Sequence, residues 1–419
     1  MKHCPEFEVD LLCDSGEVSA LDLDFREFGT RFRLFPQSPL LSAYDEPETV
    51  WIPLSPGEIG AGPSDKRMYI VDAIDKPHYE DPFLPPFRGK LNPPAKASED
   101  GHFDHLEVGT QEFEAAHMYG TLRFVLGIWE TYFEREIEWS FSDHYKQLEL
   151  VPWLDWDNAH AGYGFIEMGW GKNDKGEKFP YNLNFDVLAH EFGHTLLYSV
   201  IGMPDDDRAT AEFFAFHETA SDLVAVVSVL HFNSVLDRLL EKTSGNLYAR
   251  NELNRIGEES ATRQIRMASN NFKMPDVPDP NTPLDQLNHK QIHDLSLPMT
   301  GALFDLLIEV FQQNLVDAGL IDEELDQFSR GATEQATDNE EVQARFDAFY
   351  IQNPVGFKKA LVDARDYLGL ILSLSWEQLS WDMDYPQVIR SLFRADRMHT
   401  SGYYHQEIAE VFDWREMTY

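Results

Sequence analysis

Two histidines bracket a glutamate in the segment HEFGH, which contains His190, Glu191 and His194. On a helix, side chains at i and i+4 lie on one face, so both imidazoles can hold the same ion. Neutral imidazole suits Zn²⁺, and a glutamate between two such ligands can take a proton from metal-bound water. The spacing therefore indicates zinc-dependent hydrolysis with Glu191 as the general base.

A catalytic zinc site uses three protein ligands and leaves one position open. A third histidine six residues after His194 is excluded, because Leu197 and Val200 stand where that longer motif needs glycine and histidine. Further along the chain, Glu218 and Asp222 lie four residues apart. One of these two carboxylates can bind the metal while the other orients a ligand histidine.

Two helices must carry these residues. Apolar side chains recur at helical spacing over 185–201, and Gly202 ends that segment. A second helix is predicted over 211–232.

Strands, bounded by prolines and glycines, are predicted over 50–54, 68–74, 148–153 and 164–170. Further helices are predicted over 113–135, 235–241, 301–313, 340–350, 357–372 and 385–394, and a long loop over 268–290. Strands early and helices late predict an α+β fold.

HEFGH followed by a downstream helix with E-x-x-x-D resembles the thermolysin-like gluzincin metallopeptidases. The resemblance implies one catalytic Zn²⁺ held by His190, His194 and Glu218. It also implies that Glu191 is the general base and that Asp222 supports a ligand histidine from behind. The activity implied is hydrolysis of peptide bonds.

Other segments resemble the same family in the same order. Asn158 and Ala159, followed by 164–171, resemble the edge strand that pairs with the substrate backbone, so both residues are expected to contact substrate. Arg266 resembles the arginine that holds a substrate carbonyl. His293 resembles the catalytic histidine that stabilises the developing oxyanion. The acid that the family places shortly before this histidine has three candidates here: Asp285, Asn288 and Asp294.

The chain also departs from the family pattern. Residues 199–217 contain no tyrosine, so the tyrosine that assists the oxyanion has no clear counterpart. Asp186 matches one calcium-binding position, but its partner position is Val229. A calcium ion is possible there, although the usual paired site is incomplete, and Asp186 is instead expected to cap the helix or support His190. His217 replaces the usual asparagine before Glu218 and could likewise hydrogen-bond a zinc histidine.

The composition limits the partners. The 419 residues carry a formal net charge of −39, which argues against nucleic acid or an anionic membrane as the main partner. A peptide or protein substrate is expected, and the oligomeric state is left open. No signal-peptide pattern and no apolar run of about 18 residues is present, so we expect a cytoplasmic protein or a mature form lacking its leader.

Together these observations predict a two-lobed, thermolysin-like α+β zinc metallopeptidase, with the zinc helix between a β-rich N-terminal part and a mainly helical C-terminal part. The expected division is a β-rich region of uncertain role over 1–110, a catalytic subdomain over 111–232 and a mainly helical subdomain over 233–419. An endopeptidase is the leading hypothesis. The alternatives are a catalytically impaired zinc-binding interaction protein and a narrow-specificity intracellular protease acting on one protein partner.

Overall fold

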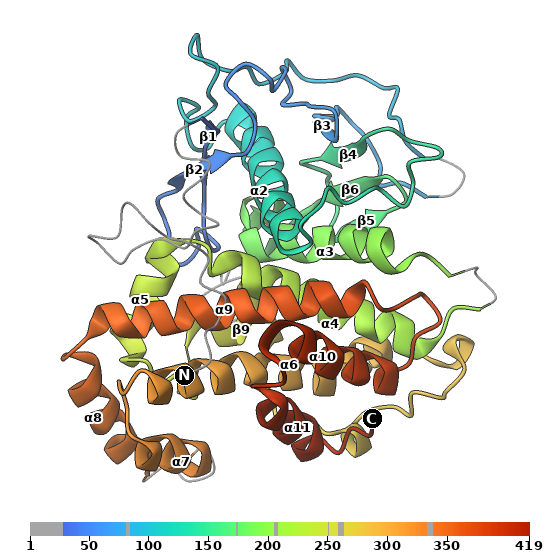
Figure 1. Ribbon diagram of the computed structural model, residues 1–419. Coiled ribbons are helices and arrows are strands. Elements are labelled where there is room, and N and C mark those ends of the chain that lie inside the picture. The colour runs from blue at the N-terminus through green and yellow to red at the C-terminus, as the bar shows by residue number, and fades with distance from the viewer. Residues whose placement is uncertain are drawn as a thin grey trace.

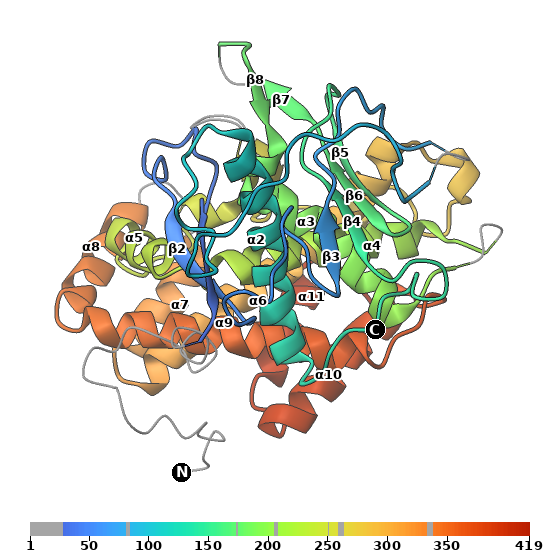
Figure 2. The ribbon, with the colours of Figure 1, turned by 90° about the horizontal axis from the view of Figure 1, so that it is seen from above.

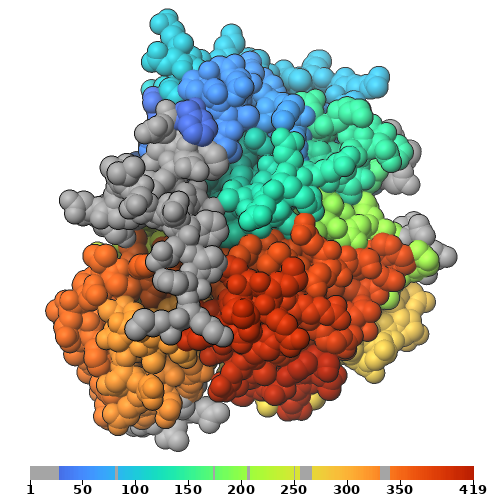
Figure 3. All heavy atoms as spheres, in the orientation of Figure 1, coloured from blue at the N-terminus to red at the C-terminus, as the bar shows by residue number. Residues whose placement is uncertain are grey.

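The computed structural model describes residues 28–419 except 81–83, 173–174, 205–207, 250, 259–263 and 333–337. For 255–258, 264–266, 331–332 and 338–339 it describes the backbone alone. The fold is mixed α+β, with small sheets in the first half of the chain and a mostly helical C-terminal half, as predicted (Figure 1). Figure 3 shows this division at the surface: N-terminal segments (blue to teal) form the upper part of that face and C-terminal helices (orange to red) the lower part.

The largest sheet has four strands in the order β3-β4-β6-β5. Strands β3, β4 and β6 are parallel, and β5 is antiparallel to β6. Their bounds are Met68–Ile70 (β3), Leu148–Val151 (β4), Ala159–Gly162 (β5) and Phe165–Met168 (β6). In this sheet the edge strand nearest the zinc-motif helix is therefore β5. The expectation that 164–171 belongs to the edge strand was wrong, because β6 is hydrogen-bonded on both sides.

The two faces of this sheet differ in chemistry. Alternate residues such as Leu150 and Ile166 join the main hydrophobic core. On the opposite face, Glu149 and Glu167 are fully buried. Glu149 accepts a hydrogen bond from the Phe87 backbone N–H at 2.9 Å, and Glu167 pairs with Lys76. These satisfied carboxylates fix the connector after β3 over the outer face of the sheet.

Three smaller antiparallel pairs complete the strands. They are β1 (Thr30–Leu34) with β2 (Glu48–Ile52), β7 (Trp170–Lys172) with β8 (Lys178–Pro180), and β9 (Arg255–Glu258) with β10 (Gln264–Met267). The β7–β8 hairpin projects from the body of the molecule and comes just before the zinc-motif helix in the chain (Figure 2).

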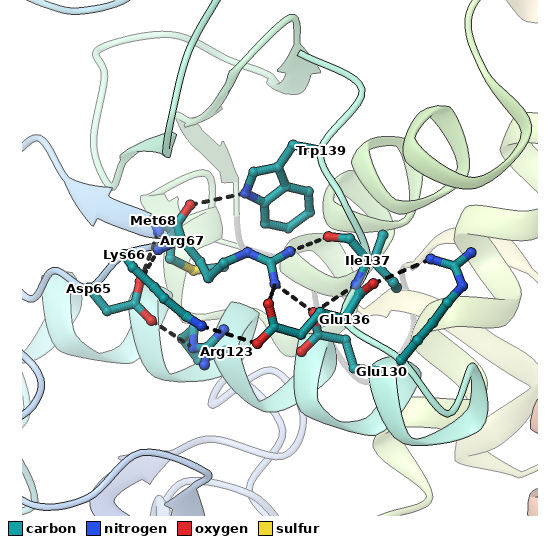
Figure 4. A network of polar contacts seen from close by, with 10 residues as sticks. Asp65, Lys66, Arg67, Met68, Arg123, Glu130, Glu136, Ile137 and Trp139 are labelled. Carbon is teal, nitrogen blue, oxygen red and sulfur yellow. Dashed lines mark hydrogen bonds and ion pairs between the residues drawn. The ribbon is translucent and has the colours of Figure 1, made fainter. Parts of the chain in front are cut away.

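An ion-pair network joins the start of β3 to helix α2 (Gln111–Tyr132), as Figure 4 shows. Asp65 accepts backbone hydrogen bonds from the start of β3 and lies 3.2 Å from Nε of Arg123 on α2. Arg67 Nη1 donates to Glu130 Oε1 at 2.7 Å, and its guanidinium lies over Trp139, 4.4 Å from the ring centroid. The four charged side chains of these two ion pairs, Asp65, Arg67, Arg123 and Glu130, are all largely buried. The network therefore sets how the sheet meets α2.

His117 performs a similar task near the zinc-motif helix. It is fully buried on α2, where Nε2 accepts from the Phe35 backbone N–H at 3.0 Å and Nδ1 lies 2.8 Å from the Asn182 carbonyl oxygen. Burial lowers the pKa of His117 to about 4, so the ring is neutral at pH 7. The imidazole thus ties β1, α2 and the turn before the zinc-motif helix together.

The zinc-motif helix, α3 (Phe185–Ile201), has the predicted bounds and packs against α4 (Ala211–Val229). Asn184 caps α3 by accepting from two backbone N–H groups, Thr210 caps α4, and Gly202 ends α3 at a φ of 87°. The other helices are α5 (Asn233–Thr243), α6 (His289–Asp317), α7 (Glu323–Ala332), α8 (Asp338–Tyr350), α9 (Pro354–Trp376), α10 (Tyr385–Thr400) and α11 (His405–Trp414).

Helix α6 differs most from its prediction. It begins at His289, within the predicted loop, because Asn288 and Gln291 form a capping box that nucleates it well before residue 301. Helices α4, α6 and α9 pack in succession and supply much of one continuous core. In the part of the chain that the structure describes, no single helix is long and apolar enough to cross a membrane; only the pair α4 and α5, bent by 91°, meets that test by length and composition.

Candidate metal centre

Helix α3 presents two imidazoles side by side. The rings of His190 and His194 lie on one helical face, with centroids 4.9 Å apart. His190 is buried and His194 is only partly exposed. Glu191, between them in the sequence, is also partly exposed. One face of α3 therefore offers two nitrogen ligands at the boundary between core and solvent.

Helix α4 brings a carboxylate to both rings. Glu218 Oε2 lies 3.5 Å from His190 Nε2, and Glu218 Oε1 lies 3.7 Å from His194 Nε2. One ligand atom from each of the three residues lies within 4.8 Å of the others. Two nitrogens and a carboxylate oxygen at this separation suit Zn²⁺, whose bonds to such atoms are about 2.0–2.2 Å. Within the described residues, no other group of three or more His, Cys, Asp or Glu side chains could hold a metal.

A glycine sets how closely these two helices approach. A Cβ atom added at Gly193 would lie 2.6 Å from the Cα atom of Ser221, closer than real Cβ atoms come. Because that atom belongs to the backbone of α4, it could not turn aside. Gly193 therefore lets α3 and α4 touch at the level where Glu218 reaches the two histidines.

Asp222 lies behind one of the two imidazoles. Its side chain is only 1% exposed, and its Oδ1 atom lies 2.8 Å from His190 Nδ1. A carboxylate this close to Nδ1 favours the tautomer with its proton on that nitrogen, in which Nε2, the atom facing Glu218, is the lone-pair donor. The geometry thus separates the two acids of α4: Glu218 faces both rings, and Asp222 faces the far nitrogen of one.

His217 contacts the site by stacking. Its ring is nearly parallel to that of His194, at 8° and a centroid distance of 5.8 Å, and lies 4.2 Å from the ring of Tyr198. The expectation that His217 hydrogen-bonds a zinc histidine was wrong. Among the described residues, neither ring nitrogen of His217 has a hydrogen-bond partner. Burial, followed by the nearby His194, holds the pKa of His217 well below its usual range, so the ring is neutral.

His293 reaches the same carboxylate from α6. Its Nδ1 atom lies 2.9 Å from Glu218 Oε2, and its Nε2 atom lies 3.3 Å from Nε2 of His289, one helical turn earlier. Of the three candidates for an acid partner, Asn288 caps α6, Asp294 lies 4.0 Å from Lys290, and Asp285 belongs to the short turn 284–286. Among the described residues, the carboxylate paired with His293 is thus that of Glu218.

The predicted substrate-contacting residues lie on two strands near the helices. Ala159 begins β5, which lies beside α3, and Asn158 immediately precedes it. The Asn158 carbonyl accepts from the Gly169 backbone N–H at 2.9 Å, so the sheet already uses that acceptor. The backbone of Arg266 pairs with Ile256 in the β9–β10 hairpin. The side chain of Arg266 lies outside the described residues.

Asp186 is buried at the start of α3. Of the two roles expected for Asp186, capping the helix was wrong, because the cap is Asn184, and support of His190 stays a prediction. Gln37 Nε2 lies 3.5 Å from Asp186 Oδ1. Val229, at the position matched to the second calcium ligand, is a buried apolar residue of α4.

Two residues near the centre escaped the sequence reasoning. Tyr198 stands one turn after His194, and His289 stands one turn before His293. Burial and the charge of Glu218 raise the pKa of Tyr198 to about 12. The i, i+4 spacing that singled out the first two histidines would also have found both residues, had it been extended one turn beyond each functional histidine.

No family model matches the sequence, and no curated protein matches it. Among solved structures, the precursor of protealysin, a metalloproteinase from Serratia proteamaculans, is similar at a TM-score of 0.46 and 13% identity. That match covers 77% of this chain and 84% of the other. Similarity of this degree leaves the function to be decided by the residues of the centre.

Proposed function

We propose that this chain is a zinc-dependent metallopeptidase of the thermolysin-like type. The observation that carries the proposal is the grouping of His190, His194 and Glu218 around one point, with Asp222 behind His190. Two imidazoles and one carboxylate leave a fourth coordination position open, which is the arrangement of a catalytic rather than a structural zinc site. When bound, the metal would lower the pKa of a water molecule and polarise a carbonyl group.

The remaining chemistry belongs to the chain. Glu191 would take the proton of the attacking water and deliver it to the leaving amine. His293 would donate an N–H to the carbonyl oxygen as negative charge develops there. The edge strand β5, starting beside Asn158, would align an extended peptide along α3 by backbone pairing. Arg266 would hold a further substrate carbonyl.

The proposal is tested by metal analysis and peptide hydrolysis on the same preparation. We expect one zinc per chain and cleavage of unfolded casein that stops with a chelator and returns with zinc. Glu191→Gln should keep the zinc and lose activity by about 10²–10⁴-fold, the usual contribution of a general base. Glu241→Gln, the same change at an exposed residue of α5, is the control and should retain full activity.

Zinc bound at one per chain with no cleavage of casein or of a peptide library would refute the peptidase and favour a zinc-binding interaction protein. Full activity in Glu191→Gln would refute the assignment of the general base. Cleavage of one native protein and no other substrate would favour the narrow-specificity protease.

A further inference from the structure

Helix α6 contains a proline, Pro298, which lies between His293 and the buried C-terminal part of the same helix. Pro298 is buried within the helix and has no backbone N–H, so the Asp294 carbonyl lacks its usual helical donor. The helix is continuous through Pro298, and we call the missing hydrogen bond the break; it separates a short arm over 289–297, which carries His293, from a long arm that is largely buried. The short arm therefore needs other contacts to fix its direction.

Side chains from three different elements supply those contacts. The three successive carbonyl oxygens before Pro298 each accept a hydrogen bond from a side chain. The bonds run from Tyr385 Oη on α10 to Leu295 at 2.9 Å, from Thr219 Oγ1 on α4 to Ser296 at 3.1 Å, and from Asn270 Nδ2 to Leu297 at 3.0 Å. The donors come from separate parts of the chain and converge on a single turn of α6.

Asn270 is itself held by a residue near the C-terminus. Arg415 is fully buried; its Nη1 donates to Asn270 Oδ1 at 3.0 Å and its Nη2 to the Asn270 carbonyl at 2.7 Å. The same guanidinium donates to Asp305 Oδ2 at 2.5 Å, on the long arm of α6. Gly301 makes room for it, since a Cβ there would lie 2.5 Å from Arg415 Cζ.

These contacts connect the two arms of α6 on either side of Pro298. Arg415 is bonded to Asp305 beyond Pro298, and through Asn270 it is connected to Leu297 before Pro298. We propose that Asn270 and Arg415 form a splint across the break in α6 and are positioning residues for His293. This inference rests on the proposed peptidase function, in which His293 acts on the carbonyl oxygen.

The splint matters because a small tilt of the short arm at Pro298 moves His293 by a larger distance. About 6 Å of helix separates Leu297 from His293, so a tilt of about 10° at the break moves the imidazole by about 1 Å. A displacement of about 1 Å in a catalytic group can cost about 10²-fold in rate. Loss of the splint should therefore lower kcat and leave zinc binding on α3 and α4 intact.

The test removes the splint at its smaller member. Asn270→Ala takes away the donor to Leu297, while Arg415 keeps Asp305, the Phe272 carbonyl and the backbone of residue 270. We expect kcat to fall about 10- to 100-fold, with zinc content and KM nearly unchanged. Asn270→Asp, which keeps the acceptor for Arg415 but not the donor to Leu297, should show the same loss. Asn281→Ala is the matched control, because among the described residues this exposed side chain of the same loop bonds only to Asp279.

A double-mutant cycle separates positioning from general damage. In a His293→Ala background, Asn270→Ala should change kcat by less than about twofold, because the group it positions is gone. An unchanged kcat in the single variant, or an equal loss in both backgrounds, would overturn the proposal.

A second measurement needs no activity. The imidazole NMR signals of His293, assigned with His293→Gln in the zinc-loaded full chain, should shift in Asn270→Ala and remain in place in Asn281→Ala. A wild-type protein that cleaves no peptide would refute the proposed function, whereas His293 signals that do not move in Asn270→Ala would refute the splint.

Discussion

Replacing Gly193 with alanine tests whether the contact between α3 and α4 sets the geometry of the metal ligands. The new Cβ would stand 2.6 Å from Ser221 Cα and 3.0 Å from its Cβ and Oγ atoms. Carbon atoms in contact prefer a separation of about 3.5–4.0 Å, so the two helices must part by roughly 1 Å. Metal sites tolerate about 0.2 Å in ligand distance. Glu218 would then be carried out of range of one or both histidines.

The expected magnitudes differ for stability and for metal binding. Overpacking a tight contact costs about 1–3 kcal/mol, and replacing a helical glycine with alanine returns about 1 kcal/mol, so the metal-free protein should lose only about 0–2 kcal/mol. Zinc affinity should fall much further, by about 10- to 100-fold, as is typical when the support of a ligand is disturbed. The variant should therefore fold and bind zinc poorly.

Urea unfolding of the metal-free protein and zinc titration against a competing chelator measure the two effects separately. Gly127→Ala is the control: it is a helical glycine on α2 whose added Cβ would meet only Pro53, at 3.3 Å. That variant should keep both its stability and its zinc affinity. A Gly193→Ala protein that binds zinc as tightly as the wild type would refute the reasoning, since the helices could then part without moving the ligands.

Other consequences can be measured in the same preparations. Asp222→Asn should weaken zinc binding by about tenfold while the fold persists, because His190 loses a charged partner; unchanged affinity in the chelator titration would contradict this. The pKa of His117 is lowered from 6.5 to about 4. The contribution of its buried neutral ring to the free energy of unfolding is therefore complete above pH 6.5, and this contribution declines by about 3 kcal/mol as the pH falls to 4. His117→Gln should flatten that decline in urea unfolding followed from pH 7 to pH 4. With a net charge of −39, cationic peptides should show a higher kcat/KM than acidic ones, and the ratio should approach one as salt rises.

Local signals in the sequence were sufficient for the helix that carries the zinc motif. Its apolar periodicity and the glycine stop lie within α3 itself, and the predicted bounds agree with the observed ones. The β5–β6 hairpin was harder to interpret. Its sequence shows strand character, but only pairing with β4 reveals that β6 lies inside the sheet and β5 at its edge.

The start of α6 was missed for a different reason. Its capping box at Asn288 and Gln291 was present in the sequence, but the polar, proline-containing segment 268–290 was predicted to be a loop. Hydrogen bonds from Tyr385, Thr219 and Asn270 hold the turn before that proline, and those donors are far away in the chain. No local window of sequence contains them.

The sequence by itself determined which residue types could bind a metal and that two of them share a helical face, because i, i+4 spacing is a property of one helix. It left open which acid of α4 faces the histidines and what surrounds His217. Tertiary structure decided both: the close approach of α3 and α4 at Gly193 directs Glu218 to the two rings and Asp222 to Nδ1 of His190. The physical reason is that the relative position of two helices is set by the shapes of both surfaces where they touch.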